Sequence, residues 1–353
     1  MNAPLKLMIT AAGAPQAATL YRHLRDNGER PVSIVGLDMN PEAPGRFLAD
    51  TFHAIPKAGQ DGYNERILDI VAKERPDAFI NSSGADVLHI ARIRDNIEAL
   101  GTRVLCSSPQ AIETADNKFL LYSTLAKVPG VDVPEFHSPG SLEEFVATAE
   151  SMGYPDRDVC FKPHVSKGSR GFRILSERYD RRDLLLNHKP TAKYMTLAEF
   201  VAIFKDSPEF PKLLLMEVMQ GEEVDVMTIA HQGKALLTTA KSRESNRWGI
   251  IDLGELIDRP ELVAKTQRII ETIPLEYTIS IQFIGGKILE INPRTSTYIF
   301  AKDFNEPWLA VKLALGLATP REVSEYQQRI PLGRRMVRYM DQLFFDPDGA
   351  WYP

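Results

Sequence analysis

The sequence predicts an α/β protein in which an N-terminal parallel-sheet domain precedes a two-lobed part with antiparallel sheets and α+β character. Two observations lead to this prediction. Over residues 5–108, short apolar runs alternate with amphipathic helical segments, as in a parallel sheet joined by right-handed crossovers. From residue 213 onward, β-type runs are separated by glycines, which indicates antiparallel hairpins.

The elements follow in a regular order. In the first third we expect strands at residues 5–12, 31–38, 77–83 and 102–108, and helices at 15–28, 64–76 and 85–101. Two short helices come next, then a helix at 141–155 whose Ser141 and Glu144 form a capping box. Further expected elements are a hairpin at 158–175, a helix near 196–205, strands over 212–244, a helix at 258–274, a hairpin at 277–294, a helix at 306–318 and a C-terminal strand with a tail.

The composition is that of a globular enzyme or binding protein. The 42 basic and 47 acidic residues give a net charge of -5, which argues against a nucleic-acid binder. Cys106 and Cys160 are too few for a disulfide framework or a zinc site. The sequence has no signal-peptide pattern and no apolar run of about 18 residues. We therefore expect a soluble, cytoplasmic protein that does not bind membranes.

The first turn of the N-terminal domain resembles a dinucleotide-binding turn only in part. Asp38 closes the second strand where a ribose-binding acid would lie, but Gly13 is the single glycine of the G-x-G-x-x-G pattern. An ordinary strand-to-helix turn is the preferred interpretation.

The segment "DVCFKPHVSKGSRGFRIL" at 158–175 is a basic loop between two expected strands. Lys162 is on the leading strand, and Lys167, Arg170 and the glycines follow. Glycines allow backbone N–H groups to approach an anion, and the cations add positive charge. A basic turn on a solvated surface would have the same residues, so this segment alone does not distinguish a phosphate-binding loop from a surface turn.

The segment "SIQFIGGKILEINPRTS" contains polar residues at alternate positions of two apolar strands. Glu290 and Asn292 share one strand face, and Gln282 on the partner strand can join them. One carboxylate with two amide oxygens suits Mg²⁺, which also retains waters and phosphate ligands. Arg294 extends the same face toward the phosphates. A solvated edge strand is the alternative.

Together these segments resemble the ATP-grasp superfamily, most closely the carbamoyl-phosphate synthase large chain and its stand-alone relatives. The resemblance rests on "ADNKF", "FKPHVSKGSRGF", a "ME…GEE" segment and "LEINPRTS", in that order. It implies a pre-ATP-grasp domain at 1–110, a small lobe at 111–216 with the glycine hairpin, a large lobe at 217–320 with the Mg²⁺ site, and a C-terminal extension at 321–353. Segment 178–210 matches no catalytic element.

The resemblance also implies roles for individual residues. Lys118 and Lys162 would contact the ATP phosphates beneath the loop of Gly168, Ser169 and Gly171. Glu217 and Val218 would border the adenine, and Glu223 would bind ribose. Gln282, Glu290 and Asn292 would hold Mg²⁺, with Mn²⁺ left open as a substitute, and Arg294 would stabilise the transferred phosphoryl group.

The implied activity is an ADP-forming carboxylate-amine ligase acting on small molecules through an acylphosphate. Arg243, in "AKSRESNRWG", could hold the acceptor carboxylate bidentately; a solvated charged loop with Arg247 and Trp248 is the alternative. The single ATP-grasp module and the lack of a glutaminase portion disfavour carbamoyl chemistry. An ATP-grasp kinase and a non-catalytic ATP-binding protein remain rivals, the substrates cannot be read, and a homodimer is left open.

Overall fold

The chain forms two compact units. The structure is a computed structural model that describes residues 3–189, 193–247, 249–346 and 351–352. The first unit comprises residues 1–115, 223–282 and 291–353, and the second comprises 116–222 and 283–290. The four-part division drawn from the sequence stays a prediction.

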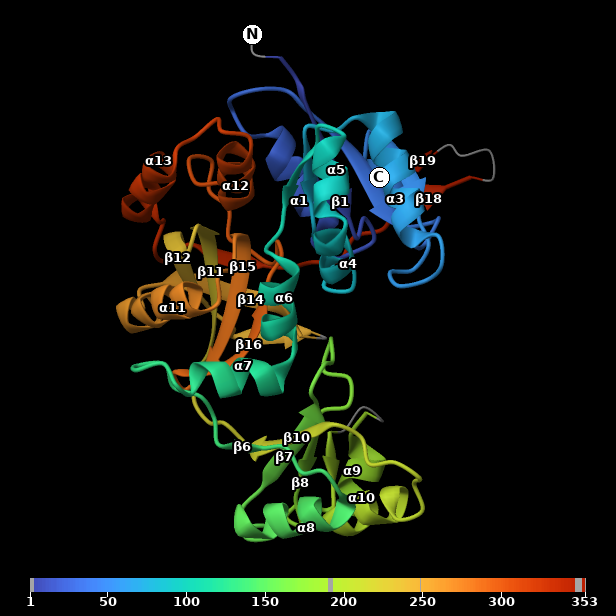
Figure 1. Cartoon of the computed structure of the whole chain (residues 1–353), viewed down its shortest axis with the longest axis vertical. Helices are drawn as coiled ribbons and strands as arrows, with labels where there is room; N and C mark the ends of the chain where they lie inside the picture. The colour runs from blue at the N-terminus through green and yellow to red at the C-terminus, as the bar shows by residue number, and fades with distance from the viewer. Residues whose placement is uncertain (1–2, 190–192, 248, 347–350, 353) are drawn as a thin grey trace. The chain divides into compact units, whose positions relative to one another are not determined.

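The first unit opens with a five-stranded parallel sheet in the order β3-β2-β1-β4-β5. Its central strand, β1, is labelled in Figure 1. The strands are β1 (Leu5–Thr10), β2 (Val32–Asp38), β3 (Thr51–Ala54), β4 (Ala78–Ile80) and β5 (Arg103–Leu105). The helices between them are α1 (Ala17–Arg25), α2 (Gly45–Leu48), α3 (Tyr63–Glu74), α4 (Val87–Arg92) and α5 (Arg94–Ala99). The predicted parallel sheet is confirmed, and it has one more strand, β3. The helix expected at 85–101 is divided into two at Ile93.

Helices cover both faces of this sheet because successive strand residues point to opposite sides. Leu7 and Ile9 of β1 pack in one cluster with Leu20 of α1. Met8, between them in the chain, packs in another cluster with Ile67 of α3. The near-continuous apolar run of β1 is therefore explained by burial on both faces.

The first unit also contains most of a larger sheet in the order β13-β14-β12-β11-β15-β16, with β17 paired to β14. Its strands are β11 (Glu223–His231), β12 (Lys234–Ser242), β13 (Ser245–Arg247), β14 (Ile250–Ile257), β15 (Tyr277–Ile284), β16 (Lys287–Asn292) and β17 (Arg335–Val337). The accompanying helices are α11 (Pro260–Thr272), α12 (Glu306–Ala314), α13 (Pro320–Glu325) and a 3₁₀ turn at Tyr326–Arg329. The antiparallel pairing of β11 with β12 agrees with the sequence prediction.

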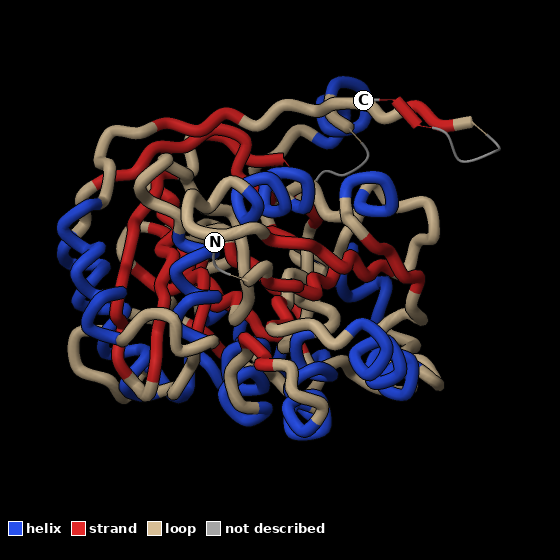
Figure 2. The backbone as a smooth tube through the Cα atoms, turned by 90° about the horizontal axis from the view of Figure 1, so that it is seen from above, coloured by secondary structure: helices blue, strands red, loops and turns tan. Residues whose placement is uncertain are grey.

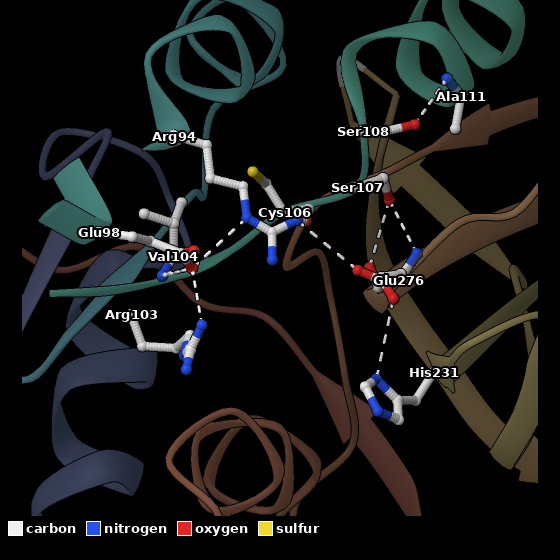
Figure 3. A network of polar contacts seen from close by, with 10 residues as sticks. All are labelled: Arg94, Glu98, Arg103, Val104, Cys106, Ser107, Ser108, Ala111, His231 and Glu276. Atoms are coloured by element: carbon white, nitrogen blue, oxygen red, sulfur yellow. Dashed lines mark hydrogen bonds and ion pairs between the residues drawn. The ribbon is translucent and has the colours of Figure 1, made fainter. Parts of the chain in front are cut away.

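A polar network ties the end of the parallel sheet to the larger sheet within the first unit (Figure 3). Arg94 donates to the Cys106 carbonyl at 3.2 Å and lies 3.7 Å from a Glu276 carboxylate oxygen. The Ser107 hydroxyl accepts from the Glu276 N–H at 2.9 Å, and His231 lies 3.8 Å from the same glutamate. The connection after β5 is therefore held against the start of β15.

The second unit is a sheet in the order β6-β10-β7-β8-β9. Its strands are β6 (Phe136–His137), β7 (Val159–Pro163), β8 (Arg173–Leu175), β9 (Tyr194–Met195) and β10 (Leu213–Glu217). The helices are α7 (Lys118–Leu125), α8 (Leu142–Ser151), α9 (Arg181–Asn187) and α10 (Leu197–Phe204), and α6 (Pro109–Asp116) leads into it. The core is aromatic, with Phe145 of α8 stacked on Phe200 of α10.

The hairpin and the helix cap that the sequence predicts in the second unit are largely confirmed. β7 and β8 form the expected antiparallel hairpin. The Ser141 hydroxyl caps α8 by accepting from the Glu144 N–H. In a capping box the Glu144 carboxylate would accept from the Ser141 N–H. It accepts instead from the Gly140 N–H, at 2.7 Å.

The C-terminal segment continues past β17 into a small hairpin of β18 (Phe344–Phe345) and β19 (Trp351–Tyr352). Figure 2 shows these strands near the C-terminus, apart from the larger sheets. Phe345 stacks on Phe47, with ring centroids 4.9 Å apart. Among the described residues, no helix is long and apolar enough to cross a bilayer.

Candidate active site

Two buried lysines define the first part of the site, and both belong to the second unit. Lys118 is the first residue of α7, whose start is fixed by the Asn117 side chain accepting from the Phe119 and Leu120 N–H groups. Its Nζ donates to the Ser166 carbonyl at 3.0 Å. Lys162 lies on β7, between β10 and β8, and its Nζ donates to the Tyr122 hydroxyl at 3.2 Å.

The electrostatics of these lysines favour a bound anion. Burial, followed by the positive charge of Lys118, lowers the pKa of Lys162 to about 8, against an opposing effect of Glu290. Burial also lowers the pKa of Lys118, while Glu290 raises it. Two buried ammonium groups that repel one another are stabilised by a polyanion such as a triphosphate.

The glycine loop between β7 and β8 bends through left-handed backbone conformations. Gly168, Ser169 and Gly171 all have positive φ angles, of 61°, 58° and 75°. A Cβ atom on Gly171 would lie 2.7 Å from the Pro163 ring, so this position requires glycine. Lys167 of this loop forms an ion pair with Asp116 at 2.6 Å. Within the loop, the Arg170 and Phe172 N–H groups donate to the Lys167 and Ser169 carbonyls, at 3.4 and 3.3 Å. Its expected role over the ATP phosphates stays a prediction.

Glu217, the last residue of β10, is held by several partners within the second unit. Its carboxylate accepts from the Glu135 N–H at 2.8 Å and forms ion pairs with Lys287 at 2.5 Å and Arg157 at 3.4 Å. Burial alone would raise the pKa of Glu217, but the bonds from Lys287 and the Glu135 N–H lower it overall. The side chain is therefore a fixed carboxylate at the expected adenine position.

A cavity of about 360 Å³ lies beside this carboxylate. It is lined by Arg157, Asp158, Arg178, Glu217, Val218, Met219, Gln220, Ile284, Gly285 and Lys287. Glu217 and Val218, which the family resemblance places beside the adenine, both line it.

Glu223 and Arg243 lie together in the first unit, at the start of β11 and just after β12. The Arg243 Nε is 2.7 Å from a Glu223 oxygen, and its Nη1 is 3.9 Å from Asp225. Only 4% of the Arg243 side chain is exposed, so it is not part of a solvated charged loop. Arg243 is therefore paired with Glu223, the residue that is expected to bind ribose. The expected contact of Arg243 with an acceptor carboxylate stays a prediction. Trp248 lies outside the described residues.

The three expected metal ligands lie on the neighbouring strands β15 and β16. Gln282 is buried on β15, in the first unit. Glu290, in the second unit, and Asn292, in the first, are half-buried at alternate positions of β16. Their oxygen donors have the chemistry that Mg²⁺ prefers. Arg294 follows β16 and donates to the Thr295 carbonyl at 3.3 Å. That the three bind one ion stays a prediction.

Sequence reasoning missed two features around the site. Tyr122 is completely buried and contacts Lys162, but no motif marks it. Asp225 and Lys241 form a fully buried ion pair at 3.4 Å beside Arg243. Asp225 lies between two apolar residues on β11, and Lys241 follows an apolar residue on the paired strand β12. This pattern could have suggested that the two side chains lie on the same face of the sheet.

Comparisons with known proteins show which families this chain resembles. Residues 209–334 match the family model described as ATP-grasp in the biosynthetic pathway with Ter operon. Residues 7–105 match the model described as PylC-like, N-terminal domain. The chain therefore contains an ATP-grasp domain behind a PylC-like N-terminal domain, which confirms the resemblance seen in its sequence.

The chain is also homologous to carbamoyl-phosphate synthase large chains. It is 26% identical over 230 residues to the arginine-specific large chain of carbamoyl phosphate synthase from Cutaneotrichosporon cutaneum, covering 65% of this chain and 17% of that protein. The chain spans only this 17% of that relative, and 12% of the length of a second one, the multifunctional protein URA2 of Saccharomyces cerevisiae.

Solved structures show the same fold. N5-carboxyaminoimidazole synthetase from Staphylococcus aureus aligns with a TM-score of 0.63 and 15% identity, over 90% of this chain and 78% of that one. The biotin carboxylase domain of 2-oxoglutarate carboxylase from Hydrogenobacter thermophilus, a dimer in complex with MgADP, ADP and bicarbonate, aligns with a TM-score of 0.62 and 18% identity, over 89% and 70%.

Proposed function

We propose that this protein is an ATP- and Mg²⁺-dependent ligase that activates a small-molecule carboxylate as an acylphosphate and joins it to an amine. The observation that carries the proposal is the pair of buried lysines, Lys118 and Lys162, beside a glycine loop, in a chain whose residues 209–334 match an ATP-grasp model. The relatives named as carboxylases, synthases and synthetases support this class of reaction.

The chemistry requires two displacements. A substrate carboxylate oxygen attacks the γ-phosphorus of ATP, the bond to the β,γ-bridging oxygen breaks, and ADP leaves. The amine then attacks the acyl carbon, loses a proton, and inorganic phosphate leaves. Lys118 and Lys162 neutralise phosphate charge, Arg294 stabilises the transferred group, and the loop at 164–172 excludes water. None of these steps needs a protein nucleophile.

The residues fit a divalent cation. Gln282, Glu290 and Asn292 would hold Mg²⁺, which supplies charge neutralisation at the phosphates when it is bound. Mn²⁺, which accepts the same oxygen donors, is proposed as a substitute. The MgADP bound by the Hydrogenobacter domain supports this choice of cofactors.

The remaining assignments are proposals of the same kind. We assign small-molecule substrates, no nucleic-acid partner and no membrane partner, in keeping with the net charge of -5. A cytoplasmic location fits two free, buried cysteines. A homodimer is supported by the dimeric Hydrogenobacter domain.

The deciding experiment measures ADP, phosphate and new products with pooled carboxylic acids and amines. A ligase releases ADP and phosphate only when both substrates are present, and it forms an amide. If the amine is replaced by hydroxylamine, the acylphosphate should appear as a hydroxamate. A stable phosphorylated product would instead indicate a kinase, and ATP binding without substrate-dependent turnover would indicate a binding protein.

A further inference from the structure

The Tyr122 hydroxyl bridges two parts of the second unit that the proposed reaction needs. It accepts a hydrogen bond from the Lys162 Nζ at 3.2 Å and donates one to the Leu289 carbonyl at 2.7 Å. Leu289 precedes Glu290 on β16. The lysine Nζ also lies 5.5 Å from the centre of the Tyr122 ring, so both the oxygen and the ring face the ammonium.

The direction of these bonds follows from the chemistry of the groups. Burial raises the pKa of the Tyr122 phenol far above its ordinary value, so the group is neutral with a single proton. The Leu289 carbonyl can only accept, and it therefore takes that proton. The phenol oxygen is left as an acceptor toward Lys162, which holds the ammonium in one direction.

One helix delivers both contacts. Lys118 and Tyr122 are four residues apart in α7, so they lie on the same face of the helix. Because Asn117 caps the start of α7, the register of both side chains is fixed by that cap. In the proposed function Lys118 contacts the phosphates itself, whereas Tyr122 contacts Lys162.

We propose that Tyr122 is a positioning residue for phosphoryl transfer, whose hydroxyl fixes the Lys162 ammonium relative to the strand that carries Glu290. The proposal rests on the proposed function, since it assumes that Lys162 contacts ATP phosphates. It predicts that removal of one oxygen atom weakens phosphate binding and leaves the nucleoside part of the site unaffected.

The test is Tyr122→Phe, with ATP and adenosine affinities measured by calorimetry. Loss of a hydrogen bond to a charged group should weaken ATP binding about tenfold, whereas adenosine affinity should change less than about twofold. A purely structural role would lower both affinities together. Tyr154→Phe is the matched control, because the Tyr154 hydroxyl is also largely buried and bonds to Glu177 and the Leu197 N–H, away from Lys162.

A double-mutant cycle tests whether the effect passes through the lysine. In a Lys162→Met background, Tyr122→Phe should leave ATP affinity unchanged. Additive losses would overturn the proposal, and so would an ATP affinity of Tyr122→Phe equal to that of the wild type. Wild-type protein that binds ATP no better than adenosine would instead overturn the proposed function itself, so the two failures are distinct. Thermal melts of each variant show that the fold is retained.

Discussion

Glu290 provides the single carboxylate among the three proposed Mg²⁺ ligands, so its charge is the property to test first. Glu290→Gln keeps the shape of the side chain and removes the negative charge, and we expect substrate-dependent ADP release to fall at least about 100-fold. Glu150→Gln, on the exposed side of α8, is the control and should be fully active. The rate of ADP release is measured at steady state for both variants, and circular dichroism shows whether each variant is folded. Unchanged turnover in Glu290→Gln would contradict the metal assignment.

Lys162 gives the site a predictable pH dependence. Burial and the charge of Lys118 lower the pKa of Lys162 to about 8, against an ordinary value of 10.5. In the ligand-free protein the ammonium therefore loses its proton as the pH rises through about 8. Since phosphate binds the charged form, ATP affinity should fall above that pH, by up to about tenfold per pH unit.

The measurement is ATP affinity between about pH 7 and pH 9.5, where one proton is coupled to binding. Lys162→Met should bind ATP weakly at every pH and should lack the fall above pH 8. A wild-type affinity that stays constant over this range would show that Lys162 keeps its proton without ATP, in conflict with its buried position.

At the scale of elements, the turn between β15 and β16 is tightly packed against the backbone of residues 220–222. Gly285 donates to the Glu222 carbonyl, and a Cβ atom placed on it would lie 2.2 Å from the Gln220 carbonyl oxygen. Gly233, in the turn between β11 and β12, also has a positive φ, but nothing lies within 4 Å of its Cβ position. The two glycines therefore separate backbone strain from steric clash.

Gly233→Ala should lower the free energy of unfolding by about 1–2 kcal/mol, the cost of a left-handed alanine. Gly285→Ala should cost about 2–4 kcal/mol, because the clash with the backbone is added to the same strain. Urea unfolding of both variants gives the comparison. Equal losses would mean that the tip moves freely away from Gln220.

The elements that could be predicted from sequence are those with strong periodicity. The apolar strand at Leu5–Thr10 and the glycine-linked strands β15 and β16 were found because their patterns depend on neighbouring residues alone. The strand β3 was missed, since "TFHA" is short and half-exposed and is defined only by pairing with β2. The division of the helix at Ile93 likewise has no local sequence signal.

For the candidate site, motifs located the residues but not their partners. Lys162 and Glu217 were found from their places beside glycine-rich segments. The ion pair between Lys287 and Glu217 joins residues that are 70 positions apart in the sequence. Tyr122 and Lys162, which are hydrogen-bonded, are 40 positions apart. Such pairings arise from tertiary packing, which periodicity does not encode. Arg243 was expected in a solvated loop or at the acceptor, and only the register of β11 with β12 explains its burial beside Glu223.

At the scale of the whole molecule, the chain passes between the two units four times, after residues 115, 222, 282 and 290. Gln282 and Glu290 stand directly before two of these passages, and Asn292 follows the last. The proposed Mg²⁺ ligands thus come from both units of the chain. If all three bind the metal as proposed, Mg²⁺ with ATP should raise the stability of the whole chain.

This stabilisation can be measured by unfolding with and without ligand. At a free Mg·ATP concentration of about 100 times the dissociation constant, the free energy of unfolding should rise by about 2.7 kcal/mol. Removal of the metal with EDTA at the same ATP concentration should lower that gain, because the γ-phosphate charge is then neutralised by lysines alone. Glu290→Gln should show little difference between the two conditions. If ATP with EDTA stabilises the wild type as much as Mg·ATP does, the trio of Gln282, Glu290 and Asn292 does not bind the metal.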